Sequence, residues 1–203
     1  MKDLKEIPYL SKDNAKVKII ELCNLKDRKL QFLGEGHEGF VFSDKNFVYK
    51  IFKPSHSQDK LYFNLNVISY ALEKLKFTFH YPFKVTYNNT YLIIYYKYEK
   101  SSEFTSASKE QFQTLLNEYY FANIVHLDLK PKNLRKFAGG TLFICDIGYD
   151  LVSFHPTFFE SMCRKAFVIY KLQNYLNEIN IKEYLSPLNK EQNFDMIEKF
   201  LKC

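Results

Sequence analysis

The chain has 203 residues, of which 46% are hydrophobic and 26% charged, so it has the size of one domain and a globular composition. Aromatic residues make up 18% of it, with 20 Phe and 16 Tyr available to fill a core. The net charge is +6, but basic residues are spread along the chain, which argues against a nucleic-acid-binding patch.

The cysteines and the N-terminal residues indicate the compartment. The four cysteines have neither metal-ligand spacing nor a disulfide framework, so we expect free thiols in a reducing environment. The N-terminus carries charges where a signal peptide needs an apolar core, and no run approaches the roughly 18 apolar residues of a membrane span. We therefore expect a cytoplasmic protein without a membrane span, working in its own cytosol or in that of a host.

The first half of the chain reads mainly as strands. Residues 1–28 have mixed charges and a weak hydrophobic pattern, and we expect an N-terminal extension with a short helix there. Apolar segments bounded by glycines and polar turns then predict strands at 29–33, 40–42, 47–52, 83–87 and 91–98. Between them, a helix is predicted over 59–75, with one apolar face made of Leu61, Leu65, Ile68 and Leu72.

The second half reads mainly as helices. A helix is predicted over 109–122, and Gly139 and Gly140 lie in a hairpin turn between two short strands. Pro156 suits the first position of a long aromatic-rich helix that ends near residue 178 and is apolar on more than one face, so we expect it to be buried. A last helix is predicted over roughly 189–202. Strands first and helices later indicate an α+β fold.

Three of the six glycines form one G-x-G-x-x-G sequence, made of Gly34, Gly36 and Gly39. This pattern alone is weak, because it occurs in dinucleotide-binding folds as well as in ATP-binding loops. A dinucleotide fold needs the loop to open a helix, whereas here Val41 lies in a following strand. The extended form G-x-G-x-x-G-x-V is typical of a two-stranded flap over ATP phosphates, with the valine beneath the adenine.

Three segments together resemble protein kinases. Residues 126–133, HLDLKPKN, resemble the catalytic loop of serine/threonine protein kinases. Asp146-Ile147-Gly148 resembles their metal-binding triplet, and Val48-Tyr49-Lys50 resembles the strand that carries their ATP-binding lysine. The resemblance implies a reduced two-lobed protein-kinase-like fold over residues 29–203. A lobe of antiparallel sheet plus one helix would end near residue 97, and a truncated helical lobe would follow from about residue 98.

The resemblance also implies an ATP- and Mg²⁺-dependent transfer of phosphate to a protein hydroxyl. Lys50 would hold the α and β phosphates, Asp128 would accept the hydroxyl proton, and Lys130 would neutralise the γ-phosphate. Asn133 and Asp146 would hold Mg²⁺. The residues implied in ATP binding are Gly34, Gly36, Gly39, Val41, Val48 and Lys50. Period-two alternation supports Lys50, because it places Val48, Lys50 and Phe52 on one strand face.

The chain departs from the kinase pattern in ways that affect its activity. The predicted helix over 59–75 lacks the usual glutamate partner for Lys50, and it offers only Glu73 near its end or Asn66 on an earlier turn. This departure keeps open a kinase-shaped binding module instead of an enzyme. Leu127 replaces the arginine that normally pairs with a phosphorylated activation loop, so we expect activity without such phosphorylation.

The short segment after Gly148 lacks the usual peptide-docking elements. In size and missing parts the chain resembles minimal effector kinases that pathogenic bacteria inject into host cells, the OspG and NleH group. That resemblance implies host signalling or ubiquitin-pathway proteins as substrates or partners. A small-molecule phosphotransferase is a further alternative, although the sequence from Asp128 to Asn133, DLKPKN, favours a protein substrate.

Overall fold

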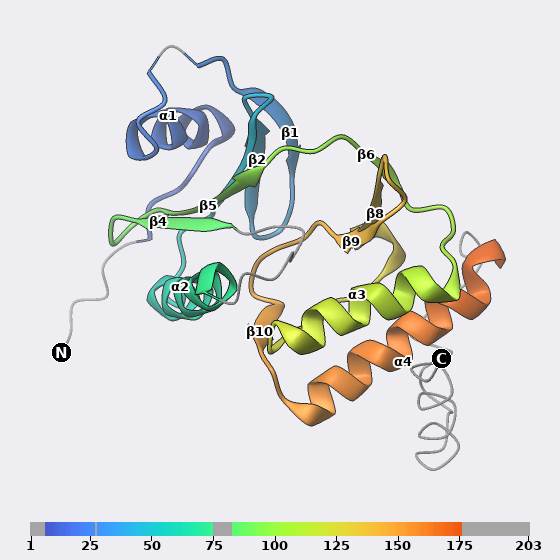
Figure 1. Cartoon of the computed structure of the whole chain (residues 1–203). Coiled ribbons are helices and arrows are strands. Elements are labelled where there is room, and N and C mark those ends of the chain that lie inside the picture. The colour runs from blue at the N-terminus through green and yellow to red at the C-terminus, as the bar shows by residue number, and fades with distance from the viewer. Residues whose placement is uncertain (1–6, 27, 75–82, 176–203) are drawn as a thin grey trace. The chain divides into compact units, whose positions relative to one another are not determined.

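The computed structural model describes residues 7–26, 28–74 and 83–175 (Figure 1). The chain has an α+β fold and divides into two compact units. Among the described residues, unit 1 runs to Glu99 and unit 2 begins at Lys100. The predicted helix over 189–202 lies outside the described residues.

Unit 1 contains one antiparallel five-stranded sheet in the order β1-β2-β3-β5-β4. Its strands are β1 (Gln31–Glu35), β2 (Gly39–Ser43), β3 (Phe47–Phe52), β4 (Lys84–Tyr87) and β5 (Leu92–Lys97). All five correspond to predicted strands. The first lies two residues later than predicted, because Gly34 and Glu35 pair with Val41 and Phe40.

The two faces of β3 have different neighbours. Tyr49 and Ile51 belong to a hydrophobic cluster that also contains Phe42. Residues two apart on a strand share a face, and the Lys50 ammonium accordingly lies 4.9 Å from the ring centroid of Phe52. The predicted alternation of β3 is therefore confirmed, with Lys50 on the face opposite the cluster.

Helix α1 (Lys12–Leu22) covers the face that carries Tyr49 and Ile51. Ser11 caps it by accepting a hydrogen bond from the Asn14 amide at 3.2 Å. Ala15 and Ile19, four residues apart, are fully buried in the same cluster as the sheet residues. Residues that we expected to form an extension thus complete the core of unit 1.

Helix α2 (Gln58–Lys74) agrees closely with its prediction. Its buried residues include all four of the predicted apolar face, Leu61, Leu65, Ile68 and Leu72. The helix packs on β4, and Figure 1 shows it on the side of the sheet opposite α1.

Unit 2 combines two helices with two small antiparallel sheets. The helices are α3 (Lys109–Phe121) and α4 (Pro156–Leu172), which is followed by the 3₁₀ turn η2 (Gln173–Tyr175). One sheet has the order β6-β8-β9, formed by β6 (Ser101–Glu103), β8 (Leu134–Phe137) and β9 (Leu142–Ile144). The other pairs β7 (Ile124–His126) with β10 (Leu151–Ser153), and both helices pack on β7. The hairpin predicted around Gly139 and Gly140 is confirmed as β8-β9.

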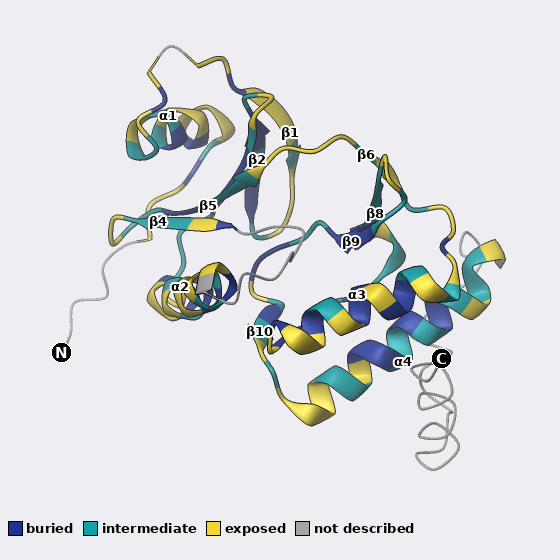
Figure 2. Ribbon diagram, viewed as in Figure 1, coloured by how far each residue is buried: buried dark blue, intermediate teal, exposed yellow. Residues whose placement is uncertain are grey.

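The prediction that α4 is buried on more than one face is confirmed in part. The helix packs on α3 and β7, and its buried residues are spread around more than half of its circumference; they are Met162, Cys163, Ala166, Val168 and Ile169. Phe158 is 45% exposed, and Phe167 is only half-buried. Figure 2 shows both buried and exposed stripes on this helix, so its aromatic residues include surface positions. Within the described residues, no helix is long and apolar enough to cross a bilayer.

Replacement of Gly39 by alanine tests the packing of the β2-β3 hairpin. A Cβ at this position would overlap the carbonyl oxygen of Ile51 and lie 3.0 Å from Phe52 Cα, so we expect a loss of about 3 kcal/mol or more in unfolding free energy. A Cβ at Gly36 meets no atom within 4 Å, so Gly36→Ala should change stability by less than about 1 kcal/mol. Urea denaturation measures both variants, and equal losses would contradict the packing argument.

Candidate functional site

The segment from His126 to Asn133 is anchored by main-chain contacts at both ends. His126 ends β7 and pairs with Leu151 of β10, and the Leu127 amide donates to the Asp150 carbonyl at 2.7 Å. At the other end, the 3₁₀ turn η1 (Pro131–Asn133) leads directly into β8. Two strands of different sheets therefore define where the short loop between them lies.

His126 connects this loop to the segment that carries Asp146. The imidazole is 1% exposed, and its Nε2 lies 2.6 Å from the Asp146 carbonyl oxygen. The Asp128 amide donates to Nδ1 at 3.3 Å. A carbonyl needs a donor and an amide N–H needs an acceptor, so these two contacts select the neutral imidazole with its proton on Nε2. Burial lowers the pKa of His126, against opposing effects from the hydrogen bond to Asp146 and the nearby carboxylates.

The carboxylate of Asp128 is held by two other members of the loop. Lys130 Nζ donates a hydrogen bond to Asp128 Oδ2 and forms an ion pair with it. Asn133 Nδ2 lies 3.0 Å from the Asp128 carbonyl oxygen and 3.4 Å from its Oδ2. The Asp128 side chain is nevertheless 37% exposed, so a substrate hydroxyl can reach this oriented carboxylate.

Asn133 and Asp146, the two predicted metal ligands, lie on connected segments of unit 2. The Cys145 amide donates to the Asn133 carbonyl at 2.8 Å, next to the contact between Asp146 and His126. Because Nδ2 of Asn133 is engaged by Asp128, its Oδ1 is the atom left for a metal. An amide oxygen and a carboxylate suit Mg²⁺, which takes few protein ligands and keeps waters and phosphates. The described residues include no cluster of three or more His, Cys, Asp or Glu side chains suited to a metal.

The remaining predicted site residues belong to unit 1. Val41 lies directly opposite Lys50 in the β2-β3 pair, so the two share a face of the sheet with Val48. Lys50 is 8% exposed and Val48 is 6% exposed. This face is the one that α1 does not cover.

Lys50 has a partner that we did not predict. Its ammonium lies 2.5 Å from Glu38 Oε2, in an ion pair whose side chains are 10% and 19% exposed. Glu73 and Asn66, the two predicted alternatives, are exposed on α2. The register of the hairpin places Glu38 beside Lys53, whose amide donates to its carbonyl at 2.8 Å. The strand register therefore does not pair Glu38 with Lys50, and the ion pair depends on the backbone conformation of the glycine loop.

The three loop glycines have different local roles. Gly39 is required by the close approach of β3, as described above. A Cβ at Gly34 or Gly36 would meet no atom within 4 Å. Close packing within unit 1 therefore does not explain these two glycines.

A scan of the sequence against protein-family models and a search of curated protein sequences found no match. The functional argument therefore depends on the residues and geometry of the chain itself.

The buried neutral His126 should make stability depend on pH. The pKa of an unfolded histidine is about 6.5. Because the folded pKa is lower, the unfolded chain binds more protons between the two values. The contribution of His126 is complete above about pH 6.5 and is lost as the pH falls toward the folded pKa, by at most about 1.4 kcal/mol per pH unit.

Urea denaturation at several pH values between 5 and 7.5 measures this contribution. The free energy of unfolding should fall more steeply with acidification in the wild type than in His126→Gln, which cannot titrate at this position. Parallel pH profiles for the two proteins would contradict the buried neutral imidazole.

Proposed function

We propose that this chain is an ATP- and Mg²⁺-dependent serine/threonine protein kinase. The observation that carries the proposal is the arrangement of residues 126–133, in which Asp128 is oriented by Lys130 and Asn133 on a loop braced by His126. This arrangement joins an exposed carboxylate, a cation and an amide, which are the groups that phosphoryl transfer from ATP needs near the accepting hydroxyl.

Each residue has a defined part in the proposed reaction. Asp128 orients the substrate hydroxyl and accepts its proton as the hydroxyl oxygen bonds to the γ-phosphorus. The bond between the γ-phosphorus and the bridging oxygen breaks, and ADP leaves. Lys130 moves its positive charge from Asp128 toward the γ-phosphate oxygens. Lys50 binds the α and β phosphates below the loop of Gly34, Gly36 and Gly39.

The metal-binding part of the proposal concerns Asn133 and Asp146. Their oxygen atoms fit the hard-ligand preference of Mg²⁺. When bound, magnesium would neutralise the charge on the phosphate oxygens of ATP. In this proposal Asn133 also positions Asp128 through its amide nitrogen, so the metal-binding and base positions depend on the same side chain.

The expected partner is a protein rather than a small molecule. The substrate class follows from the sequence between Asp128 and Asn133. The resemblance to minimal effector kinases makes host signalling or ubiquitin-pathway proteins in a host cytosol the proposed targets. Leu127 stands at the position of a regulatory arginine, and its carbonyl accepts a hydrogen bond from Lys165 of α4. Activity independent of loop phosphorylation is therefore part of the proposal.

One observation favours a second function, a kinase-shaped binding module. Lys50 is paired with Glu38 of the glycine loop, while Glu73 of α2 lies exposed. A lysine engaged in this way can leave nucleotide bound without productive orientation. Such a protein would act through partner binding, and it would bind Mg²⁺–ATP without transferring phosphate.

Transfer of labelled γ-phosphate tests the primary proposal. Wild type should label itself or a protein in a eukaryotic lysate, whereas Asp128→Ala and Asp146→Ala should lower the rate by roughly 10²- to 10⁴-fold. Lys132→Ala is the matched control, because Lys132 is an exposed neighbour in the same turn with no assigned role. Stabilisation of wild type by Mg²⁺–ATP without any transfer would favour the binding module, and neither effect would refute both functions.

The ion pair between Lys50 and Glu38 gives a second test. The Glu38 carboxylate competes with phosphate oxygens for the Lys50 ammonium, so Glu38→Gln should tighten Mg²⁺–ATP binding by roughly three- to tenfold. Glu35→Gln is the matched control, because Glu35 pairs with Lys53 on the exposed side of the same loop at 2.7 Å. Isothermal titration calorimetry measures both, and weaker binding by Glu38→Gln would instead assign Glu38 the orientation of Lys50.

A further inference from the structure

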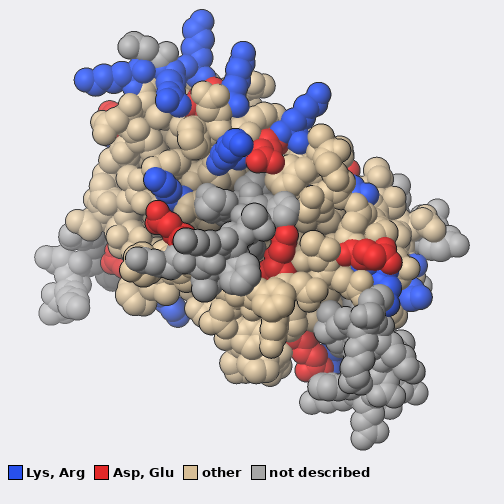
Figure 3. Space-filling model, viewed as in Figure 1, with Lys and Arg blue, Asp and Glu red and all other residues tan. Residues whose placement is uncertain are grey.

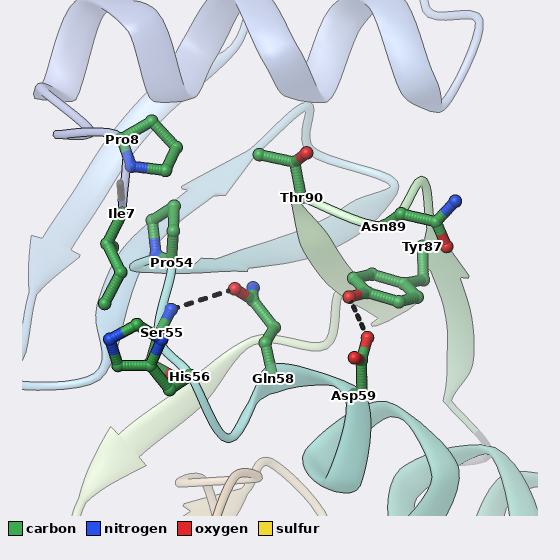
Figure 4. Close-up of a pocket in the computed structure, with 10 residues that line it drawn as sticks. All are labelled: Ile7, Pro8, Pro54, Ser55, His56, Gln58, Asp59, Tyr87, Asn89 and Thr90. Atoms are coloured by element: carbon green, nitrogen blue, oxygen red, sulfur yellow. Dashed lines mark hydrogen bonds between the residues drawn. The ribbon is translucent and has the colours of Figure 1, made fainter. Parts of the chain in front are cut away.

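Unit 1 contains a pocket at the N-terminus of α2 (Figure 4). It has a volume of about 230 Å³, below the roughly 300–1,000 Å³ of sites for drug-sized ligands. One side is apolar, formed by Ile7, Pro8 and Pro54. Asn89 and Thr90, from the turn between β4 and β5, line the other side. The pocket therefore suits a small group with one apolar and one polar part.

Gln58 places a buried donor in this pocket. The residue is 4% exposed, and Figure 4 shows its side chain rising from α2 between Pro54 and Thr90. Its Oε1 accepts a hydrogen bond from the Ser55 amide at 3.1 Å. Its Nε2 is buried and has no hydrogen-bond partner among the described residues.

The hydrogen bond from Ser55 also determines which way the amide of Gln58 is turned. A rotation of the amide by 180° would place Nε2 against the Ser55 N–H, which is itself a donor. The NH₂ group is therefore held on the side away from Ser55. A buried donor without an acceptor is energetically unfavourable, so an acceptor on a ligand at this position relieves that penalty.

Another glutamine in the same chain has the same side-chain contact three residues back and indicates which acceptor suits this geometry. In α3, Gln111 Oε1 accepts from the Ser108 amide at 2.9 Å, just as Gln58 accepts from Ser55. The Nε2 of Gln111 donates to a backbone carbonyl, that of Gly140. The two glutamines thus both accept from the amide three residues earlier, and in Gln111 the remaining donor binds a peptide carbonyl.

The charge of the lining argues against an anion. Asp59 is part of the pocket, and its carboxylate accepts a hydrogen bond from the Tyr87 hydroxyl. A phosphate or carboxylate ligand would be repelled by this negative charge. None of the described residues that line the pocket is a Lys or Arg.

From these observations we infer that this pocket binds a neutral peptide amide of a partner protein, whose carbonyl oxygen accepts a hydrogen bond from Gln58 Nε2. The aliphatic part of the bound residue packs against Ile7, Pro8 and Pro54. The site is separate from the residues assigned to ATP, and it needs no catalytic activity of the chain.

Nuclear magnetic resonance with small probes tests this inference on the full-length protein. Isobutyramide supplies a neutral amide on a branched aliphatic group, and isobutyrate is its anionic counterpart of the same shape. Inorganic phosphate serves as a third probe. We expect isobutyramide to shift the side-chain NH₂ signals of Gln58 in a saturable manner. The dissociation constant should lie in the millimolar range, because a ligand of so few atoms binds weakly. The two anions should bind at least tenfold more weakly.

Gln58→Glu is the matched variant, because it keeps an acceptor for the Ser55 amide and replaces the donor by a second carboxylate oxygen. An acidic residue is favourable in the first turn of a helix, so helix content by circular dichroism should be unchanged. Binding of isobutyramide, followed through the Thr90 and Asn89 amides, should weaken at least tenfold. If Gln58→Glu binds isobutyramide as well as wild type does, Gln58 serves only as an acceptor for the Ser55 amide and the inference fails.

The comparison of probes on wild type needs no variant. Equal or stronger shifts with isobutyrate or phosphate would assign an anion site and overturn the inference. A lack of saturable shifts with any probe up to 100 mM, on the order of a hundredfold above the expected range, would also overturn it.

Discussion

One neutral imidazole holds together the two segments on which the proposed chemistry depends. His126 accepts from the Asp128 amide and donates to the Asp146 carbonyl, so the same ring positions both backbones. Its burial and its place at the junction of β7 and β10 keep water from competing for these bonds. The carboxylate of Asp128 remains partly exposed because the bracing acts on main-chain atoms and leaves the side chain to Lys130 and Asn133.

In unit 1, the corresponding constraint is the ion pair between Lys50 and Glu38. An ammonium that is 8% exposed needs a compensating charge, and the glycine loop supplies it through Glu38. The pair connects β3 to the loop between β1 and β2. Under the proposed function, the phosphate oxygens of ATP and the Glu38 carboxylate would compete for the same cation, so nucleotide binding would be coupled to the position of this loop.

Two glutamine side chains connect local structure with longer-range contacts. Gln111 and Gln58 each accept a hydrogen bond from the amide of a serine three residues earlier, near the start of a helix. In α3 the NH₂ group of Gln111 donates to Gly140 and thereby attaches the β8-β9 turn to the helix. The buried NH₂ group of Gln58 has no partner among the described residues, and in the inference above it is the donor to a ligand.

Several features were determined by the sequence itself. The five strands of unit 1, the buried face of α2, the β8-β9 hairpin and the alternation around Lys50 follow from short-range periodicity and turn residues. The positions of Asp128, Lys130 and Asn133 in one short loop are likewise a matter of spacing. The tertiary structure alone decided that α1 completes the core, because only Ala15 and Ile19 are fully buried in a helix of otherwise mixed character. It also decided that Phe158 of α4 is exposed and that Glu38 pairs with Lys50, because both depend on which distant surfaces meet, and sequence periodicity does not encode that.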